Sequence, residues 1–269
     1  MTQPTTSFVG EIPALYDKHL GPVIFEPYAR DLAARLDCPQ GGRVLEMAAG
    51  TGIVTRRLIT SLPADASLVV TDLNPPMLEI AQRNLSNDPR VTYQQADAQA
   101  LPFEDHSFDR VVMQFGIMFL PDKVLGLREA KRVLKPGGKL LFNVWGNLQD
   151  NAYAVAAHST VQGFFASDPP KFYETPFSWC DERVILDALT SAGFHAPKLQ
   201  WVDLDTTAES AAHFSTGLVK GNPVSLELAE RGTAPVEEVR AAVERALIRI
   251  GGDKPWRGRL HVLVVSASA

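Results

Sequence analysis

Four polar side chains end or follow four apolar segments of the chain: Glu46, Asp72, Asp97 and Gln114. A carboxylate can accept two hydrogen bonds from the hydroxyl groups of a ribose, one on each oxygen. It can also accept one from the exocyclic amine of adenine, while the next backbone N–H donates to a ring nitrogen. These residue types therefore suit the binding of an adenine nucleoside.

Asp72 is well placed to bind a ribose. It follows Gly52 by about 20 residues, the usual separation between a glycine-containing turn and a ribose-binding carboxylate. A carboxylate in this position can instead cap the helix that follows. Because Asn74 already offers such a cap, we favour the ligand role for Asp72.

The other three polar residues each have a second interpretation. Asp97 could bind adenine or stabilise its own turn, as aspartate often does. Glu46 could face a bound amine or brace the loop that follows it. Gln114 could face a ligand or pack at the edge of the core. Residue type alone leaves these alternatives open.

A short apolar strand and a turn of small residues position Glu46. Residues 44–45 are apolar, Gly50 and Gly52 lie in the turn, and a helix pattern follows at once. Small residues let the backbone approach a ligand, and the first turn of a helix has unpaired N–H groups. The dinucleotide pattern G-x-G-x-x-G is not met, because Thr55 stands at its last position.

Strands alternate with helices along the rest of the chain. The chain begins with a helix at 16–36 or with a shorter helix at 14–20 before it, Pro22 being the interruption. After the strand at 44–45, strands are predicted at 67–72, 90–96, 108–115, 139–145, 197–204 and 259–266. Further helices are predicted at 77–85, 121–134, 151–166, 181–192, 206–219, 225–230 and 235–250. This order predicts βαβ units with right-handed crossovers. We therefore expect a doubly wound α/β fold with a mostly parallel seven-stranded sheet, whose carboxyl edge collects the four polar residues.

The composition is that of an ordinary globular protein. The chain is 45% hydrophobic with a net charge of -5, which argues weakly against a nucleic-acid partner. Cys38 and Cys180 are the only cysteines, too few for a disulfide scaffold or a structural zinc site. The first residues do not resemble a secretory signal, and no apolar run reaches the roughly 18 residues of a membrane span. We expect a cytoplasmic protein without a metal site.

Four segments resemble the motifs of class I S-adenosylmethionine-dependent methyltransferases. Residues 44–52 resemble motif I, and the others are VVTDLNPPMLEIA, QQADAQALPFEDHSFDRVVMQFGIMFLPD and EAKRVLKPGGKLLFNVW. They occur in the expected order over about residues 40–146. The subgroup that matches best includes quinone-biosynthesis C-methyltransferases and related small-molecule methyltransferases. The resemblance implies their Rossmann-like fold and S-adenosyl-L-methionine as the cofactor.

The resemblance implies which residues would lie along the methionine part of the cofactor. These are Glu46 and the loop that contains Ala48, Gly50 and Gly52, while Gln114 would lie near the transferred methyl group. The chain departs from the family at Ala48, where the first glycine of motif I usually stands. Alanine narrows the allowed backbone angles.

The adenosine part of the cofactor would contact the next two strand ends. By the same resemblance, Asp72 would hold the ribose hydroxyls and Leu73 would lie against the adenine. Asp97 and Ala98 would bind the adenine edge. The helix that follows Asp72 adds Met77 to the cofactor-binding set.

The resemblance divides the chain into three parts. Residues 1–40 would form an N-terminal helical lid segment, from which Tyr16 would reach the cofactor, and residues 41–146 would form the cofactor-binding core. Residues 147–269 would complete the sheet, with helical insertions at 147–180 and 206–256 as a substrate cap. The alternatives are a lid helix that simply packs on the sheet, and cap aromatics that simply form a core.

The expected reaction is methyl transfer to an O, N or C nucleophile of a small, partly apolar acceptor. Because the sulfonium donor is already activated, the protein mainly has to align the nucleophile and exclude water. No catalytic residue is assigned, since His19, His106, His158 and His213 are candidate general bases by residue type only. The alternatives are a protein that binds the cofactor without turnover and a nicotinamide-dependent oxidoreductase, which the motif match disfavours. A homodimer is a further expectation.

Overall fold

The computed structural model of the chain describes residues 8–85, 88–232 and 234–269. Residues 1–7, the beginning of the predicted lid segment, lie outside this part. The chain forms two compact units, which are treated one at a time. The helical unit comprises Met1–Pro27, Gly146–Ser178 and Asp203–His261, and the sheet unit comprises Tyr28–Trp145, Trp179–Val202 and Val262–Ala269.

A seven-stranded sheet forms the centre of the sheet unit, as the sequence predicts. The strands are β1 Arg43–Glu46, β2 Ser67–Asp72, β3 Val91–Gln95, β4 Phe108–Gln114, β5 Leu134–Trp145, β6 His195–Ala208 and β7 Trp256–Ser268. Their order is β3-β2-β1-β4-β5-β7-β6. Strands β1 to β5 run parallel, and β7 runs antiparallel to β5. The order reverses at β1, so a ligand crevice is expected at the carboxyl ends of β1 and its neighbours.

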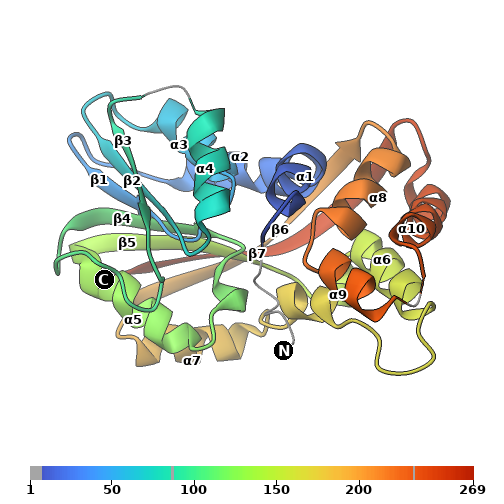
Figure 1. Ribbon diagram of the computed structural model, residues 1–269. Helices are drawn as coiled ribbons and strands as arrows, with labels where there is room; N and C mark the ends of the chain where they lie inside the picture. Colours follow the sequence, from blue (N-terminus) through green and yellow to red (C-terminus); the bar gives the residue numbers. More distant parts are fainter. Residues whose placement is uncertain (1–7, 86–87, 233) are drawn as a thin grey trace. The chain divides into compact units, whose positions relative to one another are not determined.

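Helices cover both faces of this sheet (Figure 1). They are α2 Glu26–Arg35, α3 Ile53–Ser61, α4 Pro75–Asn84, α5 Lys123–Val133 and α7 Glu182–Ser191, with the short helix η2 Ile117–Phe119. Asp181 begins α7, because its carboxylate accepts hydrogen bonds from the N–H groups of Arg183 and Val184. Gly193, with a φ of 83°, follows the end of this helix, as predicted.

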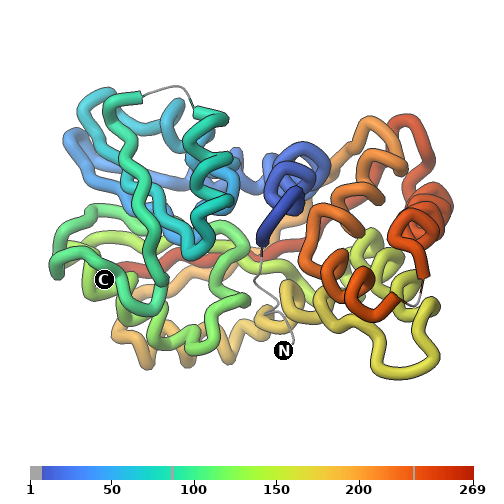
Figure 2. Tube along the Cα trace, viewed as in Figure 1, coloured from blue at the N-terminus to red at the C-terminus, as the bar shows by residue number. Residues whose placement is uncertain are grey.

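Three distant segments of the chain assemble the helical unit, which Figure 2 shows as blue, yellow and orange-to-red tube. Its helices are α1 Ile12–His19, η1 Gly21–Phe25, η3 Leu148–Asp150, α6 Ala152–Gln162, η4 Phe172–Phe177, α8 Ala211–Lys220, α9 Val224–Arg231 and α10 Val236–Gly251. In its core the rings of Phe214 and Trp256 pack together, with their centroids 4.7 Å apart. The indole N–H of Trp256 donates to the carbonyl of Leu247 at 3.1 Å.

Several predicted element boundaries are wrong: strand β5 begins at Leu134 instead of residue 139, and α6 ends at Gln162 instead of residue 166. Strand β6 continues to Ala208, where a helix was expected from residue 206, because burial still alternates there and Ser210 begins α8 by accepting from the N–H of His213. Strand β7 begins at Trp256 instead of residue 259. The segment predicted as one helix or as two interrupted at Pro22 is three helices, with Pro22 in the π-helical η1. Within the described ranges, no helix is long and apolar enough to cross a membrane.

Candidate functional site

The carboxyl ends of β2, β1 and β4 bring three of the predicted side chains onto one face of the sheet. Glu46 is paired in register with Val70 on one side and Val112 on the other. Asp72 and Gln114 each lie two residues beyond these partners, so they project from the same face as Glu46. The expectation that strand ends collect these polar residues is met for this part of the site.

The loop after β1 is held in left-handed backbone conformations. The φ angles are 52° at Ala48, 57° at Gly50 and 78° at Gly52. A Cβ on Gly52 would lie 2.9 Å from the Cβ of Ala81 on α4, so glycine is needed there for space as well as for its φ. Ala48 adopts this conformation without being glycine, so the departure from motif I leaves the loop geometry intact at a cost in backbone strain.

Asp72 braces this loop. One carboxylate oxygen accepts from the N–H of Gly50 at 2.8 Å, and the other from the N–H and side-chain amide of Asn74 at 2.8 and 3.2 Å. Burial raises the pKa of Asp72, and the hydrogen bonds oppose that shift. Asn74 stands at the N-cap of α4 as predicted, but its side chain makes no cap hydrogen bond to the helix. A carboxylate has about four acceptor positions, so Asp72 keeps acceptor capacity for a ligand.

Glu46 is the most unusual group of the site. Its side chain is 1% exposed, and its Oε2 has no hydrogen-bond partner among the described residues. Burial raises its pKa from 4.5 to about 8, although Thr55 beside it lowers the pKa in part. The buried hydroxyl of Thr51 has no hydrogen-bond partner in the described chain either, whereas Thr55 lowers the Glu46 pKa by hydrogen bonding to it.

Two unpaired polar atoms, on Glu46 and Thr51, argue for a bound polar ligand beside this loop. Each buried polar atom left unpaired costs about 1–3 kcal/mol, so such a cluster is rare in a purely structural core. A cationic ammonium group would pair with the Glu46 carboxylate and stabilise its charged form. The methionine part of S-adenosylmethionine carries such an ammonium, and the residues present therefore fit this cofactor.

The end of β3 supplies the other predicted residues of the adenosine site. Asp97 accepts a hydrogen bond from the N–H of Gln99 at 2.8 Å, which is the turn-stabilising role considered from the sequence. Ala98 is buried at 9% exposed. Leu73 is 52% exposed, an uncommon position for leucine at a strand end and one from which it could cover a flat ring.

The two remaining predicted cofactor residues belong to helices. Met77 is 4% exposed and packs in the core beneath α4. Tyr16 belongs to the helical unit, where its ring stacks on Phe25 at 4.7 Å and meets the edge of Phe8 at 5.6 Å. The roles of both in cofactor binding stay predictions.

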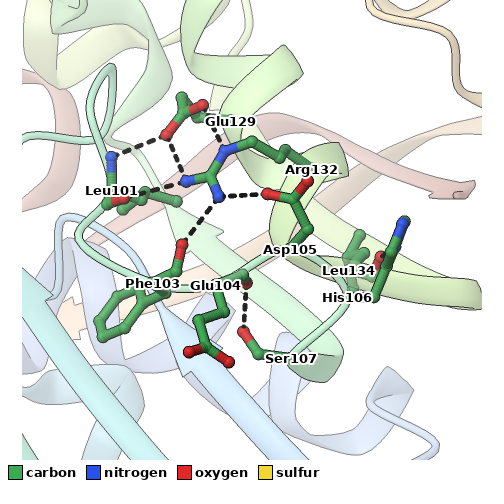
Figure 3. Close-up of polar contacts among 9 residues, drawn as sticks. All are labelled: Leu101, Phe103, Glu104, Asp105, His106, Ser107, Glu129, Arg132 and Leu134. Carbon is green, nitrogen blue, oxygen red and sulfur yellow. Dashed lines mark hydrogen bonds and ion pairs between the residues drawn. The ribbon is translucent and has the colours of Figure 1, made fainter.

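Sequence reasoning missed a guanidinium clamp on the loop that follows Asp97 (Figure 3). Arg132 of α5 donates to both oxygens of Glu129 at 2.8 Å, to the carbonyls of Leu101 and Phe103 at 2.9 and 2.7 Å, and to Asp105 at 2.7 Å. Glu129 in turn accepts from the N–H of Leu101 at 2.8 Å. The sequence pattern marked the apolar face of this helix only, so nothing in it indicated this clamp.

Comparisons with known proteins agree with this geometry. The family model described as a methyltransferase domain matches residues 44–138. Over 101 residues the chain is 44% identical to a demethylmenaquinone methyltransferase of Clavibacter sepedonicus, a match that covers 38% of this chain and 40% of that protein. The chain therefore spans about two fifths of the length of the curated relatives it matches.

Solved structures agree in fold over most of the chain. A putative methyltransferase of Bacillus halodurans C-125 has a TM-score of 0.59 at 20% identity, covering 89% of this chain and 97% of that one. Phosphoethanolamine N-methyltransferase 2 of Haemonchus contortus, in complex with S-adenosyl-L-methionine, has a TM-score of 0.62 at 15% identity, covering 99% and 60%. Neither the oxidoreductase nor the non-catalytic alternative is favoured by these matches. Residues 44–138 therefore match a methyltransferase domain, over the stretch in which the four motifs lie.

Proposed function

We propose that the protein transfers a methyl group from S-adenosylmethionine to a small-molecule acceptor. The observation that carries this proposal is the buried, unpaired carboxylate oxygen of Glu46 beside the loop of a methyltransferase domain. In its ionised form this atom would pair with a cationic group, and the cofactor carries an ammonium. The sequence relatives support the same activity over the part of the chain that they share.

Each end of the cofactor would meet groups of complementary chemistry. Glu46 would hold the ammonium group, and Asp72 would accept from the ribose hydroxyls with the acceptor capacity that its three hydrogen bonds leave. Leu73 would cover one face of the adenine. Asp97 and Ala98 would bind the adenine edge, if the second oxygen of Asp97 accepts from the exocyclic amine while the first holds the turn.

The protein's part in the reaction is then binding and alignment. The bound cofactor supplies an activated methyl group, so no nucleophilic side chain is needed. The loop at Ala48–Gly52 fixes the methionine end, and the buried surroundings of Glu46 keep water away from it. A general base for the acceptor stays unassigned.

The acceptor is proposed to be a small ring compound that is at least partly apolar. The curated relatives are named for demethylmenaquinone and for ubiquinone and menaquinone biosynthesis. A quinol-type ring with an activated carbon is therefore the first acceptor to test. A homodimer and a cytoplasmic location also stay predictions, and sedimentation velocity tests the first of them.

Two measurements test the proposal. Calorimetry with S-adenosylmethionine, S-adenosylhomocysteine and NAD should show binding of the first two, and binding of NAD alone would exclude the proposed cofactor. Mass spectrometry should then detect S-adenosylhomocysteine formed only when a quinol-type acceptor is present. Binding of the cofactor with no turnover on any acceptor of a panel of O, N and C nucleophiles would instead support a non-catalytic binder.

A further inference from the structure

Phe115 breaks the regular course of β4 immediately after Gln114. Gln114 pairs in register with Asn143 of β5, and Trp145, two residues on, projects from the same face as that pair. A continuing strand would carry the Phe115 ring to the opposite face. Instead Phe115 has a φ of 50°, and its ring stacks flat on Trp145, with centroids 3.9 Å apart and 4° between the planes.

This conformation is strained, so the surroundings must hold it. A bulky residue with positive φ is a rare outlier that costs of order 1–3 kcal/mol. The edge of Tyr28 meets the Phe115 ring at 5.8 Å and the Trp145 ring at 6.1 Å. The hydroxyl of Tyr28 is itself fixed by donating to the carbonyl of Val202 at 2.8 Å. The rings of Tyr28 and Trp145 hold the side chain of Phe115 in place.

Asn143 holds the backbone of Phe115. Its side-chain oxygen accepts from the N–H of Phe115 at 3.0 Å, and its backbone carbonyl lies 3.3 Å from the same nitrogen. Asn143 is 0% exposed, and its neighbours Phe142 and Val144 are buried and apolar. Its amide nitrogen has no hydrogen-bond partner in the described chain. A buried amide with an unpaired donor is unfavourable for stability, so another requirement must account for it here.

Gly116, the next residue, lies against the loop that follows β1. A Cβ at Gly116 would lie 2.7 Å from the Cβ of Ala48 and 3.0 Å from the side chain of Met113. The methyl group of Ala48 therefore occupies the space that a side chain at Gly116 would need. Ala48 is the strained first residue of the loop at Ala48–Gly52, with a φ of 52°.

We infer that Asn143 is a positioning residue of the cofactor site. It fixes the backbone of Phe115, so that Gly116 leaves space for the side chain of Ala48 to pack against it. This contact holds the loop at Ala48–Gly52 in its conformation. The inference rests on the proposed function only in taking this loop to bind the methionine end of the cofactor. It assigns to β5 a role in a loop two strands away in the sheet. It also explains how alanine is accommodated at the position of the first motif I glycine.

Substitutions of Asn143 test the first contact. Asn143→Leu keeps the branched shape of the side chain but removes the acceptor, and should weaken S-adenosylhomocysteine affinity about tenfold. Asn143→Asp retains an acceptor oxygen and should recover most of that affinity at a pH where the carboxyl is protonated. Asn151→Leu is the matched control, because Asn151 is also 0% exposed and bonded to backbone but lies in the helical unit. Equal losses at Asn143 and Asn151 would overturn the inference.

A double-mutant cycle between Ala48 and Gly116 tests the second contact. Gly116→Ala should weaken S-adenosylhomocysteine binding and lower the unfolding midpoint, because two methyl groups would overlap. Adding Ala48→Gly should restore most of both losses. Additive effects on the unfolding midpoint would refute the contact. Because the midpoint is read without ligand, this result stands even if the proposed cofactor fails to bind.

Discussion

The charge of Glu46 should change when the cofactor binds. Its pKa is raised from 4.5 to about 8 by burial, so below that pH the free protein holds a proton that a bound ammonium would expel. As the pH is raised toward 8, the affinity for S-adenosylhomocysteine should therefore increase, by up to about tenfold for each pH unit. Calorimetry in buffers of different ionisation enthalpy measures the released proton directly.

Glu46→Gln supplies the control for this pH dependence. In the wild-type protein the folded state holds the proton between pH 4.5 and about 8 while the unfolded state has released it, so stability falls as pH rises. The glutamine variant has no such proton and should lose less stability over this range. It should also bind S-adenosylhomocysteine more weakly, without proton release. Equal pH slopes in both proteins would show that Glu46 does not titrate there.

Substitution of Asp72 should affect both stability and cofactor binding, because this residue holds the loop and, by our proposal, the ribose as well. Asp72→Ala removes three hydrogen bonds that hold the loop and the start of α4, besides any bond to the cofactor. We expect a loss of about 1–3 kcal/mol in cofactor binding, together with a lower unfolding midpoint. Asp88→Ala is a control, because Asp88 pairs with Arg90 at 2.7 Å before the amino end of β3, at the opposite end of the strand from Asp97. An unchanged affinity in Asp72→Ala would remove the ligand role.

At the scale of single residues, the sequence reveals the ligands better than the geometry that holds them. Glu46, Asp72 and Gln114 can be predicted to share one edge because parallel strands end together. The positive φ angles of Ala48 and Phe115 cannot be predicted, because residues other than glycine rarely adopt them. Nor does the sequence show that Asp72 already braces its own loop.

At the scale of elements, the contact between α5 and the loop after β3 leads to a further prediction. Arg132→Lys cannot keep the paired bonds to Glu129 and the two carbonyls, since an ammonium lacks the planar fork of a guanidinium. We expect a loss of about 1.5–3 kcal/mol in unfolding free energy. The affinity for adenosine should also fall in this variant, because the loop that Arg132 holds directly follows Asp97.

Arg128→Lys is the matched control for this prediction. Arg128 lies on the same helix, and its guanidinium reaches the carbonyl of Ser191 at 3.4 Å, a long contact at the surface. Chemical denaturation should show little change for this variant. If both variants lose the same stability, the Arg132 clamp has no special role in holding the loop.

The regular elements could be predicted because their apolar periods are clear, and the failures have local causes. Strand β2 has the predicted bounds, since its buried run is short and flanked by turns. The end of β6 is predicted as helix because the stretch from Thr206 to Ala208 is too short to distinguish the helical from the strand period of hydrophobicity. The π-helical η1 has no sequence pattern that separates it from an ordinary helix.

At the scale of the whole molecule, the helical unit shows where prediction from sequence stops. Three segments form it, and the first is separated from the other two by more than a hundred residues of chain. The hydrophobic periodicity of a sequence indicates which face of a helix is buried. It does not indicate which distant segment of the chain packs against that face. The sequence could therefore mark the helices of this unit but could not show that residues 8–27 assemble with them.

The two units should nevertheless unfold together. Helix α2 and strands β6 and β7 each continue from one unit into the other, so neither unit can open without breaking an element of its neighbour. Hydrogen exchange should give the slowest amides of α10, in the helical unit, the same opening free energy as those of β4. S-adenosylhomocysteine at 100 times its Kd should raise both by about 2.7 kcal/mol. A lower value in α10 that the ligand leaves unchanged would show that the helical unit opens on its own.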